Sequence, residues 1–196
     1  MLKINKKSDK LIIVVHEIYG INQHMVDVCN LLSEENFDII CPDLFEHIPF
    51  DYSQEEMAYH FFMDNAGFLN GLHKIKNILI DSKDEYSKIF IIGFSIGATV
   101  AWLCSEEEGV DGIVGYYGSR IRDYVNIHPN CPVLLFFPNE EKSFNVNELV
   151  STIDQPNIDA HICRGEHGFS DPYSSKYNEE LAKSTFRETV NFFKNN

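Results

Sequence analysis

The stretch Ile89-Phe90-Ile91-Ile92-Gly93-Phe94-Ser95-Ile96-Gly97 decides the fold that the sequence predicts. Its first four residues form an apolar run typical of a buried strand, and a segment with helical spacing begins at Ile96. Between the two stands the pattern G-x-S-x-G, whose glycines allow a tight turn that exposes the serine hydroxyl above a sheet. We therefore interpret Ser95 as a candidate nucleophile rather than as an incidental serine in a glycine-rich turn.

The order of strand and then helix repeats outward from this stretch in both directions. Runs that are apolar throughout suit strands buried on both faces: Leu11–Val15, Asp38–Cys41, Ile89–Ile92, Gly112–Tyr116, Val133–Phe137 and Ile158–Cys163. Longer segments with helical spacing lie between and after them: Gln23–Glu35, Gln54–Ser82, Ile96–Glu107, Val146–Ile153 and Tyr177–Phe193. This alternation predicts an α/β fold, with a mainly parallel central sheet and helices on both faces.

The segment Gln54–Ser82 is long for one helix and contains Gly67 and Gly71, so we expect it to break in two. Its aromatic residues, Tyr59 to Phe62 with Phe68, either shape a substrate pocket or pack against the sheet. Both interpretations fit the spacing.

Length and charge narrow the class of protein. The chain of 196 residues suits one domain, residues 1–196, because no repeat or linker divides it. Its net charge of −14 makes it a poor partner for nucleic acid or for an anionic membrane surface. The longest weakly polar stretch, Ile89–Cys104, is too short to span a membrane. We expect a small-molecule substrate, with a monomer favoured where the sequence leaves the oligomeric state open.

The five cysteines are scattered and form no C-x-x-C pair, which argues against a disulfide framework or a zinc site. No histidine spacing of the type H-E-x-x-H indicates another metal. We therefore expect no metal, no cofactor and a reducing, cytoplasmic location.

A serine nucleophile needs a histidine base and a carboxylate that orients the base. The G-x-S-x-G turn is typical of α/β hydrolases, in which the nucleophile, the acid and the histidine follow one another along the chain, each in a loop after a strand. His167 lies between the last predicted strand and the last predicted helix, which favours it as the base over His161, which lies inside that strand. The acid is expected after Val133–Phe137, where Glu140 and Glu141 are adjacent. The outside candidates for the acid are Asp154 and Asp159.

Four further motifs accompany the G-x-S-x-G turn, which is called the nucleophile elbow. They are His16-Glu17-Ile18-Tyr19-Gly20-Ile21-Asn22, Cys41-Pro42-Asp43-Leu44-Phe45, Gly115-Tyr116-Tyr117-Gly118 and His167-Gly168-Phe169. With these motifs in this order, the chain resembles the dienelactone hydrolase family from about Leu11 to the C-terminus. The resemblance implies the α/β-hydrolase fold. It also implies a serine hydrolase that cleaves an ester, thioester or lactone of a small molecule through an acyl-enzyme.

The resemblance assigns roles residue by residue. It makes Ser95 the nucleophile, His167 the base and Glu141 the occupant of the family's aspartate position. The backbone amides of Ile18 and Ile96 are implied to form the oxyanion hole.

The chain also departs from the family pattern. The founding members use a cysteine nucleophile, which leaves open the role of Glu17, the match to the family glutamate beside the nucleophile. Glu17, His16 and Tyr117 are expected to line the site. His16, at the end of the first predicted strand, is expected to do so without taking part in the chemistry. The arginines that bind the carboxylate of dienelactone are missing. We therefore expect neutral esters or lactones to be better substrates than carboxylate-bearing analogues, unless Lys74 or Lys76 reaches the pocket.

Two other functions fit the same residues. A binding or sensing protein keeps the hydrolase fold without using the site. An acyltransferase uses the same triad but passes the acyl group to an acceptor other than water.

Overall fold

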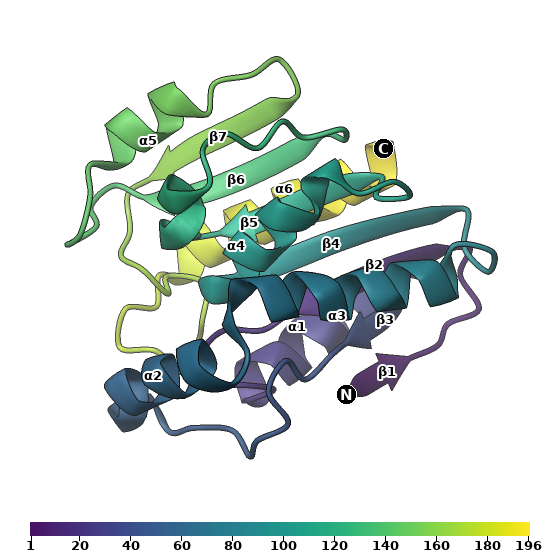
Figure 1. The fold of residues 1–196 in the computed structure, drawn as a ribbon, viewed down its shortest axis with the longest axis horizontal. Coiled ribbons are helices and arrows are strands. Elements are labelled where there is room, and N and C mark those ends of the chain that lie inside the picture. Colours follow the sequence, from purple (N-terminus) through teal and green to yellow (C-terminus); the bar gives the residue numbers. More distant parts are fainter.

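A seven-stranded sheet runs through the computed structural model, which describes residues 1–196 (Figure 1). In spatial order the strands are β1 (Leu2–Ile4), β3 (Asp38–Cys41), β2 (Lys10–Val15), β4 (Lys88–Phe94), β5 (Gly112–Tyr116), β6 (Val133–Pro138) and β7 (Ile158–Cys163). Six strands are parallel to their neighbours, and only β1 pairs antiparallel, with β3 at one edge. The expected α/β-hydrolase fold with a mainly parallel sheet is confirmed.

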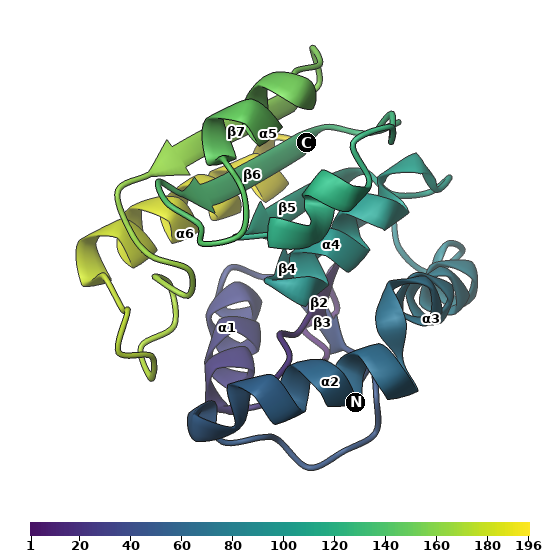
Figure 2. The same cartoon turned by 60° about the vertical axis from the view of Figure 1, so that its left-hand side comes forward.

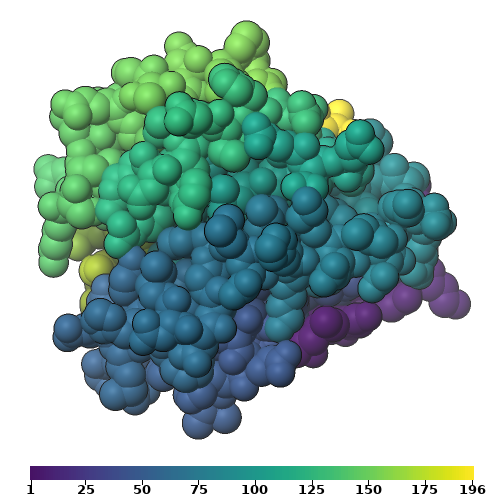
Figure 3. Space-filling model, in the orientation of Figure 1, coloured from purple at the N-terminus to yellow at the C-terminus, as the bar shows by residue number.

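Six α-helices connect and cover these strands: α1 (Gln23–Glu34), α2 (Glu55–Asn65), α3 (Gly67–Ser82), α4 (Ile96–Leu103), α5 (Val146–Thr152) and α6 (Glu179–Asn195). Figure 2 shows α1 and α6 on one side of the sheet and α3 and α4 on the other. In the space-filling view, the blue residues of α2 and α3 form the surface next to the purple N-terminal residues (Figure 3). None of the helices combines the length and the apolar character that crossing a membrane requires.

The strands are apolar throughout because each face of the sheet has its own helix layer. Ile13 and Ile91 belong to a core shared with α3 and α4, whereas Ile12 and Phe90 belong to a core shared with α1 and α6. Successive residues of a strand point to opposite faces, so two helix layers require apolar side chains at every position. Because β2 to β7 run parallel, their carboxyl ends lie at the same side of the sheet, where the loops that follow them meet.

Three details differ from or sharpen the prediction. The long segment does break, because the chain passes through Gly67 with φ of +69°, a left-handed conformation that favours glycine. Helix α4 ends at Leu103, earlier than predicted, and continues as a short 3₁₀ turn to Glu106. Strand β1 was not predicted, since its three residues include the polar Lys3 and form no apolar run.

Candidate active site

The turn between β4 and α4 is as tight as the elbow pattern predicts. Ser95 has φ of +53° and ψ of −113°, an unfavourable conformation for a residue with a side chain. A Cβ added to Gly93 would lie 2.1 Å from the carbonyl oxygen of Gly97, and one added to Gly97 would lie 2.2 Å from that of Val15. Only glycine fits at both positions. The two glycines therefore bring the start of α4 into close contact with the end of β2.

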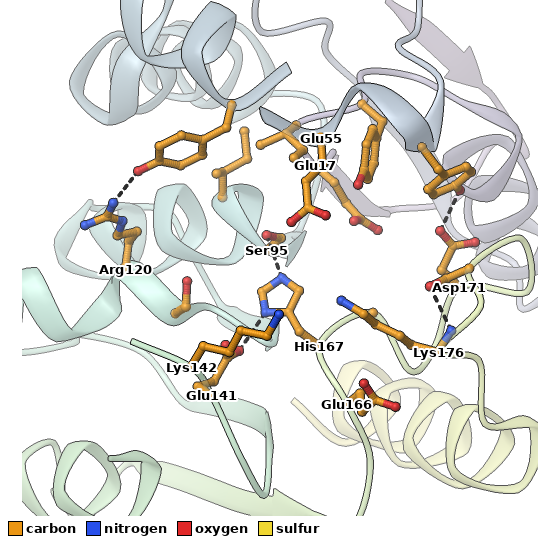
Figure 4. Close-up of a pocket in the computed structure, with 18 of the residues that line it drawn as sticks. Glu17, Glu55, Ser95, Arg120, Glu141, Lys142, Glu166, His167, Asp171 and Lys176 are labelled. Atoms are coloured by element: carbon orange, nitrogen blue, oxygen red, sulfur yellow. Dashed lines mark hydrogen bonds and ion pairs between the residues drawn. The ribbon is translucent and has the colours of Figure 1, made fainter. Parts of the chain in front are cut away.

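His167 lies between Ser95 and Glu141 (Figure 4). Its Nε2 is 2.9 Å from Ser95 Oγ, and its Nδ1 is 2.6 Å from Glu141 Oε1. The His167 side chain is 29% exposed and that of Glu141 12% exposed, so the pair is sheltered but reachable from the cavity. A carboxylate on one ring nitrogen and a hydroxyl on the other is the arrangement that lets an imidazole take the hydroxyl proton.

The loop after β6 presents Glu141, and not Glu140, to the imidazole. Glu140 is exposed to solvent and has no hydrogen bond to His167. The neighbouring Asn139 accepts a hydrogen bond from the Gly165 amide at 3.0 Å, which ties the acid loop to the histidine loop. This link fixes the distance between the two loops that carry Glu141 and His167.

The loop between β7 and α6, which carries His167 and is called the histidine loop here, is anchored by buried side chains. Phe169 is fully buried, and its amide donates to the carbonyl of Glu166 at 3.0 Å. The ring of Tyr117 lies 4.9 Å from that of His167, and the Tyr117 hydroxyl is 2.9 Å from Ser170 Oγ. Tyr117 is itself fully buried and does not line the cavity, which corrects the expectation for this residue. It supports the imidazole from the protein interior.

His16 also differs from the expectation that it lines the site. Its side chain is completely buried, and burial lowers its pKa from the ordinary value of 6.5. The Leu44 amide donates to its Nε2 at 2.9 Å, and its Nδ1 is 2.6 Å from the carbonyl oxygen of Glu17. The ring joins the loops that follow β2 and β3.

The candidate triad opens into a cavity of about 800 Å³, to which Ile18 and Ile96 also contribute. Seven acidic residues line the cavity: Glu17, Glu55, Glu56, Glu140, Glu141, Glu166 and Asp171. Three basic residues accompany them: Arg120, Lys142 and Lys176. The cavity is therefore strongly charged, with acidic groups in excess.

A model of the dienelactone hydrolase family matches residues 1–196. The chain belongs to this family. Membership confirms the family indicated by the sequence motifs and the expected enzyme class, a hydrolase of ester or lactone bonds.

The chain is similar to several known proteins along most or part of its length. It is 38% identical over 189 residues to the uncharacterized protein YczH of Bacillus subtilis (strain 168), with 94% of this chain and 91% of that protein covered. It is 26% identical over 122 residues to a carboxymethylenebutenolidase of Pseudomonas putida, with 58% of this chain and 52% of that protein covered. A solved dienelactone hydrolase-like promiscuous phosphotriesterase from metagenomic libraries has the same fold, with a TM-score of 0.75 at 15% identity and with 95% and 86% of the two chains covered.

The basic residues that line the cavity are not Lys74 and Lys76, the two lysines suggested by the sequence. Lys74 pairs with Glu46 at 3.3 Å and Lys76 with Glu107 at 3.0 Å, and neither lysine lines the cavity. Arg120 reaches the cavity from the loop after β5 and donates to the hydroxyl of Tyr59. Among the aromatic residues between Tyr59 and Phe68 that were expected either to shape a pocket or to pack against the sheet, Tyr59 lines the cavity. The buried Phe62 and Phe68 pack in the core instead.

Sequence reasoning missed a second polar cluster at the cavity wall. Glu17 Oε1 lies 3.1 Å from His24 Nδ1, and Asp171 Oδ2 lies 3.7 Å from the same nitrogen. The Tyr52 hydroxyl donates to Asp171 Oδ2 at 2.5 Å. Burial raises the pKa of Asp171 above its usual 3.8. The residues come from four separate segments, so no spacing in the sequence indicates that they meet.

This cluster has the atoms of a metal site, since its carboxylate and imidazole ligand atoms lie within 4.8 Å of one another. Its groups are, however, already engaged with one another. Asp171 Oδ2 accepts from Tyr52, and His24 Nδ1 is within hydrogen-bond distance of Glu17. These hydrogen bonds occupy Nδ1 of His24 and one carboxylate oxygen each of Glu17 and Asp171.

Proposed function

We propose that the protein is a serine hydrolase that cleaves an ester, thioester or lactone bond of a small molecule through an acyl-enzyme. The observation that carries the proposal is the continuous contact from Ser95 Oγ to His167 Nε2 at 2.9 Å and from His167 Nδ1 to Glu141 at 2.6 Å, inside an open cavity. Family membership supports the class of reaction.

In the proposed acylation step, His167 Nε2 takes the proton of Ser95 while Oγ attacks the substrate carbonyl. Glu141 remains ionised, accepts the hydrogen bond from Nδ1 and stabilises the imidazolium. As the tetrahedral intermediate collapses, the carbon–oxygen or carbon–sulfur bond breaks, and His167 returns its proton to the leaving group. The acyl group stays on Ser95 as an ester.

In this proposal the backbone amides of Ile18 and Ile96 stabilise the oxyanion. Ile96 is the first residue of α4, where an amide has no acceptor within its helix. Ile18 stands in the loop after β2 and donates to no other backbone carbonyl. Both residues line the cavity together with Ser95. Negative charge develops on the carbonyl oxygen during the reaction, so hydrogen bonds from these two amides are stronger in the transition state than in the ground state.

Deacylation repeats the same steps with water as the nucleophile. His167 takes a proton from the water, the hydroxide attacks the acyl carbon, and Ser95 recovers its proton as the acid leaves. We assign Glu17 no proton transfer in this cycle. Its carboxylate is buried and engaged with His24, so it contributes to the charge of the cavity wall.

Labelling and turnover of Ser95→Ala test this proposal. We expect a fluorophosphonate probe to label the wild-type chain, and Ser95→Ala to lose both the label and the hydrolysis of nitrophenyl esters. The matched control is Ser119→Ala, since Ser119 also lines the cavity but lies outside the triad. A folded wild-type chain that takes no label would indicate a binding protein. Transfer of the acyl group to added acceptors in preference to water would indicate an acyltransferase.

A further inference from the structure

The peptide unit between Glu17 and Ile18 is held at its carbonyl end. The Glu17 oxygen accepts from His16 Nδ1 at 2.6 Å and from the Gly20 amide at 3.2 Å. The chain has no cis peptide bond, so the N–H of Ile18 points away from that carbonyl in the same plane. Two donors on the oxygen therefore determine where the Ile18 N–H points.

The hydrogen bonds of His16 determine which ring nitrogen carries its proton. The Leu44 amide can only donate, so the Nε2 that lies 2.9 Å from it accepts. Nδ1 is then the protonated nitrogen, and it donates to the Glu17 carbonyl. Burial lowers the pKa of His16, which favours the neutral ring that this pair of contacts requires.

The backbone of His16 is fixed from the opposite side. A Cβ added to Gly97 would lie 2.6 Å from the His16 carbonyl oxygen, which places the start of α4 in direct contact with this residue. Ile96, the other expected amide donor, is the residue before Gly97. His16 therefore lies between the two backbone segments whose amides have to point at one oxygen atom.

From these contacts we propose that His16 is a positioning residue for the oxyanion hole. As a neutral imidazole protonated at Nδ1, it holds the Glu17–Ile18 peptide so that the Ile18 N–H faces the substrate carbonyl. The inference rests on the proposed hydrolase function. His16 itself is buried and does not line the cavity, so it acts through the peptide and not on the substrate.

Two substitutions separate the two hydrogen bonds of the ring. In His16→Gln, the amide oxygen can take the place of Nε2 and accept from Leu44, but the Glu17 carbonyl loses its side-chain donor. In His16→Asn, the amide nitrogen can take the place of Nδ1 and donate to Glu17, but the Leu44 amide loses its acceptor. The two variants differ in which hydrogen bond they keep.

We expect His16→Gln to lower kcat about 10- to 100-fold, because an amide that is misplaced stabilises the oxyanion poorly. KM should change less than about threefold, since the ground-state carbonyl depends little on this donor. Affinity for a trifluoromethyl ketone, which forms the oxyanion on Ser95, should fall in parallel with kcat. His16→Asn should stay within about fivefold of wild-type kcat.

Thr189→Val controls for the loss of a buried hydrogen bond elsewhere, since Thr189 Oγ1 lies 2.8 Å from the Tyr116 hydroxyl beneath α6. Thermal unfolding of all variants shows whether they fold, and Thr189→Val should keep wild-type kcat. A kcat loss in His16→Asn as large as in His16→Gln, or unchanged ketone affinity in His16→Gln, overturns the positioning role. Turnover retained by Ser95→Ala removes the proposed function, and the positioning role with it. Loss in Ser95→Ala with wild-type kcat in His16→Gln removes the positioning role alone.

Discussion

Two carboxylate–imidazole pairs contribute to the same cavity wall, and they differ in what lies beyond the ring. In the first, Glu141 contacts Nδ1 of His167, and Ser95 stands at Nε2. In the second, Glu17 contacts Nδ1 of His24, but Nε2 of His24 is buried without a partner. A base must accept a proton on the side opposite to its orienting carboxylate. Only the first pair therefore has the groups that nucleophilic catalysis needs.

The two pairs also differ in solvent access and in charge. The side chains of Glu17, His24 and Asp171 are at most 6% exposed, and the two carboxylates compete for one ring nitrogen. Burial raises the pKa of Asp171, which means that its ionised form is disfavoured in the folded protein. The second cluster therefore joins α1, the loop before α2 and the loop that carries His167, at a cost when Asp171 is ionised.

Replacing each histidine in turn should give the largest difference in activity between the two pairs. We expect His167→Asn to lower kcat/KM about 10⁴-fold or more, close to the loss in Ser95→Ala, because members of a triad act as a unit. His24→Asn should stay within about tenfold of wild type, because its Nε2 makes no contact that catalysis uses. Hydrolysis of nitrophenyl acetate measures both. Comparable losses would show that the second pair also takes part in the reaction.

The two adjacent glutamates give the next largest difference. Glu141→Gln should lower kcat about 10³- to 10⁴-fold, because an amide can hold the wrong tautomer of His167 and cannot stabilise its charged form. Glu140→Gln is the matched control and should stay within about threefold, since Glu140 has no contact with the ring. Equal and mild effects would place the acid elsewhere. Asp159, one of the alternatives, instead lies 3.0 Å from His161 on β7.

The first pair could be predicted from the sequence because each of its members directly follows a strand. Apolar runs identify the strands, and the carboxyl ends of parallel strands meet at one edge, so the topology brings together the loops that carry Ser95, Glu141 and His167. The choice between Glu140 and Glu141 came from the resemblance, since adjacent residues in a loop have no periodicity that distinguishes them.

The second cluster could not be predicted, because its members share no element and no spacing. His24 stands in the first turn of α1, and Asp171 stands in the loop between β7 and α6 that also carries His167. Tyr52 begins the short turn before α2. The burial of His16 escaped prediction for a related reason: a histidine at the end of a strand is usually half-exposed, and its two hydrogen-bond partners become visible only in three dimensions.

Stability against pH should distinguish the buried cluster. Because the pKa of Asp171 is raised by folding, the folded state binds a proton more tightly than the unfolded chain. Its contribution to stability is therefore fully present below the unfolded value of about 3.9 and is lost as the pH rises through the raised value. Asp171→Asn removes this loss. We expect its free energy of unfolding to fall less, or rise more, than that of wild type from pH 4 to pH 7.

Denaturant unfolding at several pH values measures this slope. Glu140→Gln serves as the control, since that carboxylate is exposed to solvent. Parallel pH profiles for Asp171→Asn and wild type would contradict the assignment of a buried, ionisation-sensitive cluster.

The smallest expected effect concerns the charge of the substrate. Acidic groups outnumber basic groups around the cavity, and the chain carries a net charge of −14, which should disfavour a carboxylate-bearing ester. Two exposed lysines oppose this effect, because Lys142 and Lys176 extend toward His167 (Figure 4). Arg120 is less available, since it is held by Tyr59 and Asp123.

We expect a neutral nitrophenyl ester to have a kcat/KM about tenfold above that of a carboxylate analogue of the same size, and we expect salt to narrow the gap by screening the repulsion. Lys142→Gln and Lys176→Gln should each widen the gap by up to about fivefold, the effect of one exposed charge pair. Lys74→Gln is the control and should leave the gap unchanged, because Lys74 pairs with Glu46 outside the cavity. A preference for the anion that weakens with salt and disappears in the double variant at positions 142 and 176 would reverse the assignment. The two lysines, and not the surrounding acids, would then determine which esters the cavity accepts.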